Sequence, residues 1–303
     1  MTEIAVPFHT LDVFTGERFG GNPLAVFPDA TRIPESQFQK IAREFNLSET
    51  VFVLPPKDPR AARRVRIFTP GRELPFAGHP TVGTAYLLAD LALVPLTGES
   101  TTVALEEGVG LVPVTILAKD GRIVSTQLTA AKLPEEGPAP PPRAAIARVL
   151  SLAASDVKAD PLAFSCGVPF TFVFVRDRAA LSRARVDLTA WSETMAATWA
   201  PEIFVFTDDA EPPASFRARM FAPEFGITED PATGSAVAAL AGYLFARERR
   251  ERALAAFLID QGVEMGRPSR LFLEVAIEGG KFASVKVGGK SVRVTDGAFR
   301  VAT

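Results

Sequence analysis

Side chains that can do chemistry near neutral pH are scarce in this chain. Its 303 residues include two histidines, His9 and His79, and one cysteine, Cys166. This set lacks the residues for a structural zinc site and allows no intrachain disulfide, which fits a reducing compartment. His79 directly precedes Pro80, just as Asp230 directly precedes a proline in the second half. These two dipeptides are therefore the first candidates for a functional site.

Each dipeptide stands at the start of a stretch that predicts a buried helix. Proline suits the first helical position, because its φ is fixed and its missing N–H has no partner there anyway. Asp230 is then expected to be an N-cap, while Gly83 and Gly234 lie in the first turn and allow a ligand or another backbone to come close. The stretches 82–89 and 236–244 are apolar nearly all round, which predicts helices buried inside a wrapping sheet.

The two dipeptides belong to a block that occurs once in each half of the chain. Residues 66–70 (Arg-Ile-Phe-Thr-Pro) recur as 219–223 (Arg-Met-Phe-Ala-Pro), a shift of 153. Residues 80–85 (Pro-Thr-Val-Gly-Thr-Ala) recur as 231–236 (Pro-Ala-Thr-Gly-Ser-Ala), a shift of 151. Two matches in order at nearly one offset predict structurally equivalent halves related by a pseudo-two-fold axis.

The amino ends of two such helices would form an anion site. The first turn of a helix has free N–H donors and the positive end of the helix dipole. Helices related by a pseudo-two-fold axis can face each other across the domain boundary, leaving a gap that suits a small carboxylated molecule. The same gap would stabilise the negative charge that develops when a C–H proton is removed beside a carboxylate.

A proline-rich linker divides the chain near its middle. Residues 133–142 contain five prolines in ten positions, which rules out a helix or a central strand there. We therefore expect an N-terminal domain over 1–130 and a C-terminal domain over 131–303. The last strand, about 288–303, is a candidate for a return to the first domain.

Short strand patterns outnumber helical patterns on both sides of the linker, which favours an α+β fold over a doubly wound parallel sheet. The expected helices are 35–45, 80–91, 144–152 and 231–247. The expected strands are 24–27, 50–54, 65–68, 111–117, 170–175, 202–206, 215–220, 271–275 and 282–287.

Charge and hydropathy exclude several classes of protein. The net charge is -2 and the sequence pI is about 5.9, so the chain lacks the basic face that nucleic-acid binding needs. The short basic cluster Arg60, Arg63, Arg64 and Arg66 is typical of a solvated strand edge or loop. The amino-terminal residues have no cationic start before an apolar run, and the apolar helix 236–246 is too short to span a bilayer. We predict a cytoplasmic protein that binds neither nucleic acid nor membrane.

Five segments carry a shared pattern in order along the chain: 12–27, 46–52, 73–83, 229–236 and 260–269. Together they resemble the phenazine biosynthesis-like (PhzF) family, which shares the diaminopimelate epimerase fold. The resemblance implies two domains, each a mixed sheet around a central helix, with the site between them. It also implies a homodimer and an isomerase that works without a metal or organic cofactor.

The resemblance also assigns site residues. The catalytic acid/base of the family falls on Glu49, and the residues that contact substrate fall on Gly78, His79, Asp230, Gly234 and Ser235. Asn22 belongs near the cleft in family terms. Epimerases of this fold use two cysteines at the helix starts, where this chain has none, so a two-thiol mechanism is excluded.

Each of these residues also has a plainer interpretation. Without the resemblance, Glu49 is a solvated turn carboxylate or part of a helix C-terminus, and His79 is a capping or core histidine. A capping role is sufficient to explain an aspartate directly before Pro231, whether or not Asp230 also binds substrate or transfers a proton. Asn22 is then a turn residue, and the glycines with Ser235 are architectural. As a proton shuttle, Glu49 would need a pKa raised by partial desolvation.

Three functions remain open at this point. The first is an isomerase that shifts a proton on a small carboxylated substrate, with Glu49 as acid/base and His79 and Asp230 assisting. The second is a lyase or hydratase that uses the same cleft. The third is a non-catalytic binding homologue, against which the retained Glu49, His79 and Asp230 argue.

Overall fold

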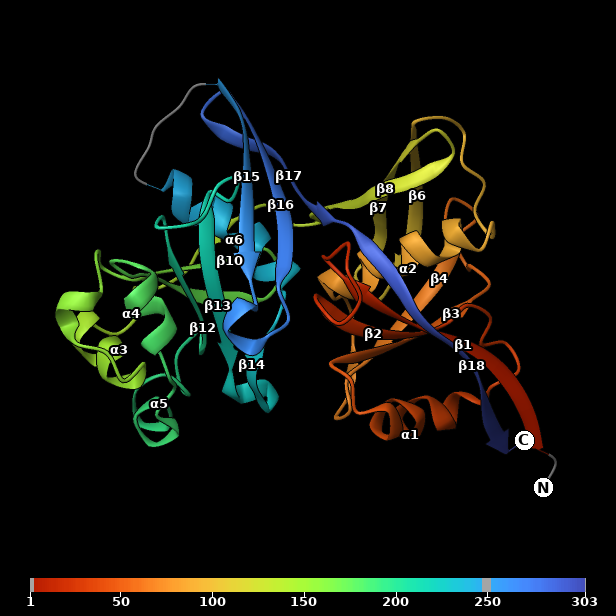
Figure 1. Ribbon diagram of the computed structural model, residues 1–303, viewed down its shortest axis with the longest axis horizontal. Helices are drawn as coiled ribbons and strands as arrows, with labels where there is room; N and C mark the ends of the chain where they lie inside the picture. The colour runs from red at the N-terminus through yellow and green to blue at the C-terminus, as the bar shows by residue number, and fades with distance from the viewer. Residues whose placement is uncertain (1–2, 247–251, 303) are drawn as a thin grey trace. The chain divides into compact units, whose positions relative to one another are not determined.

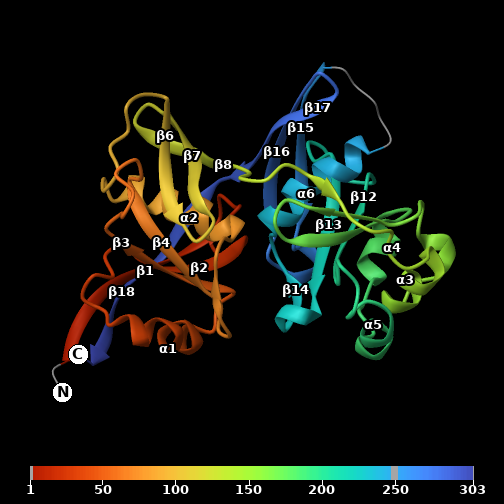
Figure 2. The ribbon, with the colours of Figure 1, turned by 180° about the vertical axis from the view of Figure 1, so that it is seen from behind.

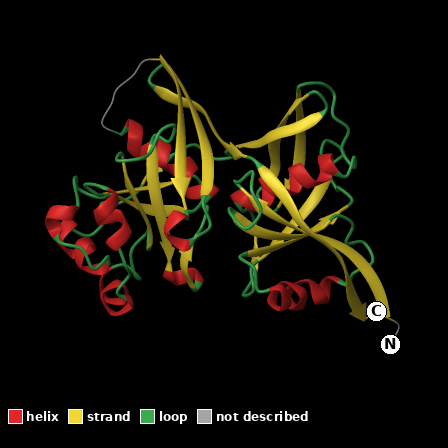
Figure 3. Cartoon of the chain, viewed as in Figure 1, coloured by secondary structure: helices red, strands yellow, loops and turns green. Residues whose placement is uncertain are grey.

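The chain folds into two compact units, each with its own sheet. Figure 1 shows the computed structural model, which describes residues 3–246 and 252–302. The first unit consists of residues 1–129 and 288–303, and the second of residues 130–287. Strands far outnumber helices (Figure 3), so the prediction of an α+β fold is confirmed.

The first unit is a mixed sheet. β1 pairs antiparallel with both β2 and β18, β2 runs parallel to β3, and β3 pairs antiparallel with β4. β4 pairs antiparallel with β5 and parallel with β6, and β6, β7 and β8 form an antiparallel meander. The elements are β1 (Glu3–Val13), β2 (Asn22–Phe27), α1 (Glu35–Phe45), β3 (Glu49–Leu54), β4 (Arg63–Phe68), β5 (Glu73–Leu74), α2 (Gly78–Asp90), β6 (Ser100–Glu107), β7 (Gly110–Lys119), β8 (Arg122–Thr129) and β18 (Ser291–Ala302).

The second unit repeats this pairing order. β11 runs parallel to β12, β12 pairs antiparallel with β13, β13 pairs antiparallel with β14 and parallel with β15, and β15 pairs antiparallel with β16. The α-helices and strands are β9 (Glu135–Glu136), α3 (Arg143–Val149), β10 (Leu162–Ser165), β11 (Pro169–Phe174), α4 (Arg178–Arg183), α5 (Leu188–Thr194), β12 (Glu202–Thr207), β13 (Phe216–Ala222), β14 (Ile227–Asp230), α6 (Gly234–Phe245), β15 (Arg252–Gln261), β16 (Ser269–Glu278) and β17 (Lys281–Gly289). Three 3-10 turns add η1 (Ala154–Asp156), η2 (Pro223–Phe225) and η3 (Val263–Met265).

One apolar helix lies inside the sheet of each unit (Figure 2). α2 contacts β1, β2, β3, β7, β8 and β18, and α6 contacts β9, β10, β11 and β16. Nearly every residue of both helices is buried, as their uniformly apolar sequences predict. A Cβ at Gly83 would lie 2.6 Å from Val13 and 2.8 Å from Leu24, so this glycine lets α2 pack closely on β1 and β2.

Amphipathic helices cover the outer faces of the sheets. α1 buries Phe38 and Ile41 in an aromatic cluster, in which Phe38 stacks on Phe52 with ring centroids 4.1 Å apart. In the second unit α3, α4 and α5 pack over β11, β12 and β13, where Ile146, Leu181 and their apolar neighbours form a separate core. These two cores fix the outer face of each sheet and leave its inner face to the central helix.

Most elements lie where the sequence predicts them, but the central helices begin elsewhere. α1 has the predicted bounds, whereas α2 begins at Gly78, two residues before Pro80, and α6 begins at Gly234, three residues after Pro231. The predicted end of the second helix, residue 247, lies outside the described residues. The predicted solvated basic cluster is also wrong in part, because Arg64 and Arg66 lie on β4 with only about a fifth of each side chain exposed.

Candidate active site

Glu49 and His79 lie together in the first unit. Glu49 is the first residue of β3, and His79 is the second residue of α2. Their side chains are 11% and 6% exposed, and Glu49 Oε2 lies 3.1 Å from His79 Nε2. The interpretation of Glu49 as a solvated turn carboxylate is therefore wrong. A buried carboxyl next to an imidazole at a helix start is an arrangement suited to proton transfer.

Burial fixes the charge state of His79. It lowers the pKa of His79 to about 3, against which a hydrogen bond to the Pro23 backbone acts. Proline has no N–H, so the imidazole donates to the Pro23 carbonyl. Since Nε2 faces Glu49, we assign this hydrogen bond to Nδ1. His79 is thus neutral at physiological pH, with the lone pair of Nε2 directed at the Glu49 carboxyl.

The start of β2 completes the surroundings of His79. Asn22 is fully buried as the first residue of β2, opposite Val13 of β1. The next residue, Pro23, supplies the carbonyl that His79 binds, and Leu24 is paired with Glu49 across the parallel strands β2 and β3. Of the predicted site residues, Asn22, Glu49, Gly78 and His79 therefore come together in the first unit.

The predicted residues of the second half gather at the start of α6. Gly234 is the first residue of this helix, Ser235 follows it, and Asp230 ends β14 with 7% of its surface exposed. The carboxylate of Asp230 accepts a hydrogen bond from the Thr233 hydroxyl. Asp230, Gly234 and Ser235 are thus close together within the second unit.

The prediction that Asp230 caps the helix is wrong. The N-cap is Thr233, whose own side chain makes no capping hydrogen bond. Gln261, the last residue of β15, explains the shift: its amide donates to the Asp230 carbonyl (2.8 Å) and accepts from the Thr233 N–H (3.2 Å). These bonds hold residues 230–233 in an extended turn, so the helix cannot begin at Pro231.

Strand register gives a different alignment of the two halves from the one that the sequence predicts. Leu74 pairs with Ile67 on β4, and Asp230 pairs with Met220 at the matching place on β13. Gly78 and Gly234 each begin the central helix, a shift of 156 in place of the predicted 151. The counterpart of His79 is therefore Ser235, and the counterpart of Asp230 is Leu74.

The same alignment identifies carboxyl groups that the sequence analysis missed. Glu202 begins β12 as Glu49 begins β3, and it is 1% exposed, with burial raising its pKa to about 8. Arg66 binds Glu73 through two 2.7 Å bonds, and Arg219 binds Glu229 in the same way. The repeated Arg-x-Phe-x-Pro block signals both arginines, but nothing near it in the sequence identifies their partners.

The thiol of Cys166 is unsuited to catalysis. Burial raises its pKa to about 12, so the reactive thiolate is scarce near neutral pH. Cys166 follows β10 and is remote in sequence from both helix starts.

Among the described residues, no group of three or more His, Cys, Asp or Glu side chains is arranged to hold a metal ion. Within the same residues, every helix is too short or too polar to cross a membrane.

Comparison with known proteins places this arrangement in a class. The fold matches a Bacillus anthracis structure described as a phenazine biosynthesis protein of the PhzF family, with a TM-score of 0.88, 23% identity and full coverage of both chains. A predicted epimerase from Pseudomonas aeruginosa has a TM-score of 0.76 at 32% identity, over 96% of this chain and 98% of the other. The fold is that of the diaminopimelate epimerase-like isomerases.

The family is also clear from sequence. The model of the phenazine biosynthesis-like family, PhzC-PhzF, matches residues 11–297. An uncharacterized isomerase of Mesorhizobium japonicum is 44% identical over 296 residues, covering 94% of this chain and 96% of the relative. The trans-2,3-dihydro-3-hydroxyanthranilate isomerase of Pseudomonas aeruginosa is 35% identical over 287 residues, covering 95% and 96%. This chain belongs to the PhzF family and is an isomerase.

Proposed function

We propose that this isomerase shifts a proton between two carbons of a small carboxylated substrate, with Glu49 as the acid/base. The observation that carries the proposal is the contact of 3.1 Å between the buried side chains of Glu49 and His79. The family relationship to a dihydro-hydroxyanthranilate isomerase supports the same reaction class. Homodimer formation stays a prediction from the family resemblance, and a cytoplasmic location stays a prediction from the sequence composition.

The proposed reaction needs only proton transfer. The Glu49 carboxylate takes a proton from one carbon, which leaves the electron pair delocalised over the substrate, and it returns the proton to another carbon. While Glu49 holds the proton, neutral His79 accepts a hydrogen bond from it at Nε2 and keeps the carboxyl oriented. The free N–H groups at the start of α2, beside Gly78, would stabilise the negative charge of the intermediate.

Residues of the second unit are proposed to bind substrate. Asp230 is buried, as a carboxylate that contacts substrate would be, and Gly234 and Ser235 offer N–H groups at the start of α6. Asn22 is proposed to hold the start of β2, and with it the carbonyl of Pro23, in place against His79. The proposal gives Asp230 an auxiliary role, because its carboxylate is already engaged by the Thr233 hydroxyl.

The test is solvent deuterium exchange with trans-2,3-dihydro-3-hydroxyanthranilate as the first substrate. Wild-type protein should bring solvent deuterium into a C–H position of this compound. Glu49→Gln keeps the size of the side chain but removes the base, so we expect exchange to fall by about 10²–10⁴-fold. Mass spectrometry of the recovered compound measures the exchange.

Glu202→Gln is the matched control. It removes a buried carboxyl from the equivalent first position of β12, and we expect it to leave exchange near the wild-type level. Exchange that persists in a folded Glu49→Gln variant would remove Glu49 from the mechanism. Conversion without any deuterium uptake, in wild-type protein, would argue against a solvent-exchangeable acid/base.

A further inference from the structure

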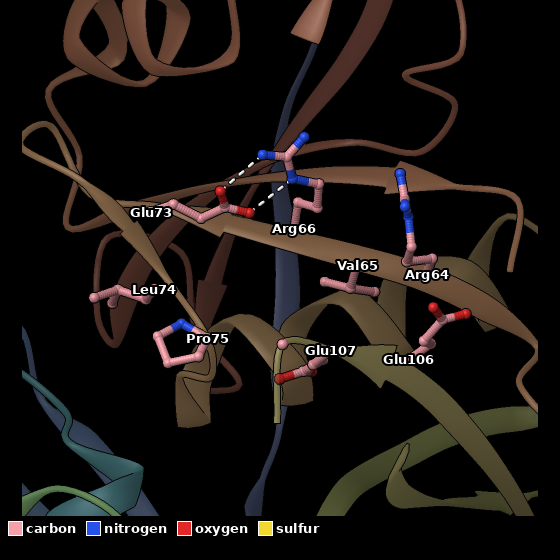
Figure 4. Close-up of a pocket in the computed structure, with 9 residues that line it drawn as sticks. Arg64, Val65, Arg66, Glu73, Leu74, Pro75, Glu106 and Glu107 are labelled. Carbon is pink, nitrogen blue, oxygen red and sulfur yellow. Dashed lines mark hydrogen bonds and ion pairs between the residues drawn. The ribbon is translucent and has the colours of Figure 1, made fainter. Parts of the chain in front are cut away.

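A cavity opens beside the start of α2, where the edge of β4 changes partners. On one edge of β4, β5 pairs with residues 67 and 68 and β6 pairs with residues 63 and 64. The middle of this edge therefore has no strand partner. The resulting pocket has a volume of about 450 Å³. Figure 4 shows the Arg66–Glu73 pair on one wall of this pocket and Glu107 on another. Glu107, the last residue of β6, is 6% exposed and has no role in the function proposed above.

The two short contacts of the Thr81 hydroxyl point to a neutral Glu107 carboxyl. The Thr81 hydroxyl oxygen lies 2.7 Å from the Ala77 carbonyl and 2.7 Å from Glu107 Oε1. A hydroxyl has one proton, and a carbonyl can only accept, so the hydroxyl proton belongs to the bond with Ala77. The contact with Glu107 is then a hydrogen bond only if the carboxyl donates. An ionised Glu107 would leave two oxygens in close contact without a proton between them.

Gln261 occupies the equivalent strand end in the second unit, although its threonine partner, Thr233, is the N-cap of α6 and Thr81 lies within the first turn of α2. Gln261 ends β15 as Glu107 ends β6, and each is followed by a glycine that packs against the proline before the helix: Gly108 against Pro75, and Gly262 against Pro231. The Gln261 amide donates to the Thr233 hydroxyl at 3.0 Å, while that hydroxyl donates to Asp230. An amide N–H₂ group thus stands where the first unit has a carboxyl.

We propose that Glu107 is a positioning residue, which donates a hydrogen bond to Thr81 as a neutral carboxylic acid and thereby holds the first turn of α2, with His79, in place. When Glu107 loses its proton, this turn is no longer held in place, so the activity of the enzyme declines at high pH. The consequence for activity rests on the proton-shifting function proposed above. The consequence for the helix start does not depend on it.

Electrostatics supports the neutral acid. Burial raises the pKa of Glu107 to about 8, even when the Thr81 hydroxyl is taken to donate to the carboxylate and so to oppose the shift. The charged groups on the same cavity are Arg64, Arg66, Glu73 and Glu106. Arg66 is bound to Glu73, and Glu106 accepts from the N–H groups of Lys57 and Asp58. The pocket gives solvent a way to the carboxyl, so its proton can leave once the pH exceeds 8.

The first experiment measures stability against pH and needs no substrate. A pKa raised from 4.5 to about 8 stabilises the fold fully below pH 4.5, and this stabilisation is lost as the pH rises to 8. Glu107→Gln places an amide at this position, as Gln261 does in the second unit, and has no carboxyl to titrate. The difference in melting temperature between this variant and the wild type should therefore shift in favour of the variant as the pH rises from 4.5 to 8. Gln261→Glu is the converse variant and should acquire such a loss. If the difference in melting temperature between Glu107→Gln and the wild type does not change with pH, the proposal is overturned.

The second experiment uses the wild-type protein and so does not depend on the folding of a variant. Amide hydrogen exchange, corrected for its intrinsic pH dependence, should show less protection in the amino-terminal turn of α2 above pH 8. The start of α6, held by Gln261, should keep its protection and serves as the internal control. Equal behaviour of the two helix starts would overturn the proposal.

The third experiment connects the helix start to catalysis. The kcat of the wild-type enzyme should fall about tenfold per pH unit above 8, while Glu107→Gln should keep the rate seen below 8 and lack this decline. An unchanged decline in Glu107→Gln would remove Glu107 as its cause. If no substrate is turned over at all, the proposed function fails, whereas the stability and exchange experiments still decide the role of Glu107.

Discussion

At the scale of single residues, one proton decides how Glu49 and His79 interact. Nδ1 of His79 is used by the Pro23 carbonyl, so Nε2 can only accept while the ring is neutral. The 3.1 Å separation from Glu49 Oε2 becomes a hydrogen bond when the carboxyl is protonated. The pair is therefore arranged to receive a proton on Glu49, which is the state that follows proton removal from a substrate.

The neutral state of His79 predicts a specific loss of stability in acid. Its pKa falls from 6.5 to about 3 on folding, so the unfolded chain binds a proton that the folded chain does not. Stability should therefore decline from pH 6.5 toward pH 3, by up to about 1.4 kcal/mol per pH unit. His79→Gln should show a smaller decline in urea unfolding measured across this range.

His9 provides the comparison for this prediction. Its Nδ1 lies 2.7 Å from Asp296 near the surface, so His9→Gln removes a histidine without changing the contact between Glu49 and His79. This variant should keep the decline of the wild-type protein. If His79→Gln and wild type respond identically to acid, His79 is charged in the folded state, and its role as a hydrogen-bond acceptor for Glu49 would be wrong.

The sequence around Glu49 and Glu107 does not predict the surroundings of their side chains. Glu49 stands in a polar patch that locally resembles a turn, and its burial comes from contact with α2, about thirty residues away in the chain. Glu107 stands in a Glu-Glu-Gly-Val hairpin of ordinary surface composition, and only strand pairing brings it to Thr81. Long-range contacts of this kind leave no local pattern.

At the scale of elements, the sequence predicted the central helices but not their first residues. Their uniformly apolar composition was a sufficient signal for burial. Proline preference placed both starts wrongly, because Pro80 is accommodated as the third residue of α2, where its missing N–H is still not needed. Pro231 instead lies in the turn that Gln261 holds open.

The arginine of the repeated block, Arg66 in the first unit and Arg219 in the second, is expected to contribute unequally to the stability of the two units. Arg219 is 3% exposed, binds Glu229 through two bonds and donates to the carbonyls of Leu181 and Ala184. Arg219→Met would leave a buried carboxylate without its cation, so we expect a loss of about 3–5 kcal/mol in urea unfolding. Helix α4 and strand β13 of the second unit would lose a contact that they share.

Arg66 makes the same pair in a more exposed place and is the matched control. Its partner Glu73 is 42% exposed, so Arg66→Met should cost only about 1 kcal/mol. Equal costs for the two variants would mean that burial does not determine the strength of this repeated pair, and that other contacts of Arg66, such as those with Phe38 and Phe68, matter as much.

At the scale of the whole chain, the repeat was the informative signal, because it concerns order along the sequence and not local propensity. It correctly predicted two units with the same succession of strand, loop and buried helix. The long outer strand β1 was not predicted, since its alternation is weak, whereas a last strand was expected over about 288–303, where β18 lies. α4 and α5 were missed because each is only six or seven residues long.

The pairing of β1 with β18 predicts that the first unit cannot fold without the last residues. The ladder runs from Glu3 opposite Ala302 to Val13 opposite Ser291, and Val301 is buried in the aromatic core beside α1. Removing residues 291–302 would leave β1 paired only with β2, over residues 9–13. We expect the truncated chain to lose catalytic activity and cooperative unfolding of the first unit, measured by circular dichroism.

Two readouts separate this local effect from general misfolding. Both tryptophans, Trp191 and Trp199, belong to the second unit, so their emission should remain close to that of the intact protein. A synthetic peptide of residues 288–302 should restore part of the lost signal by pairing with β1. A truncated chain with wild-type activity would show that β18 contributes little to the first unit, and that the inner strands around α2 are sufficient to hold Glu49 against His79.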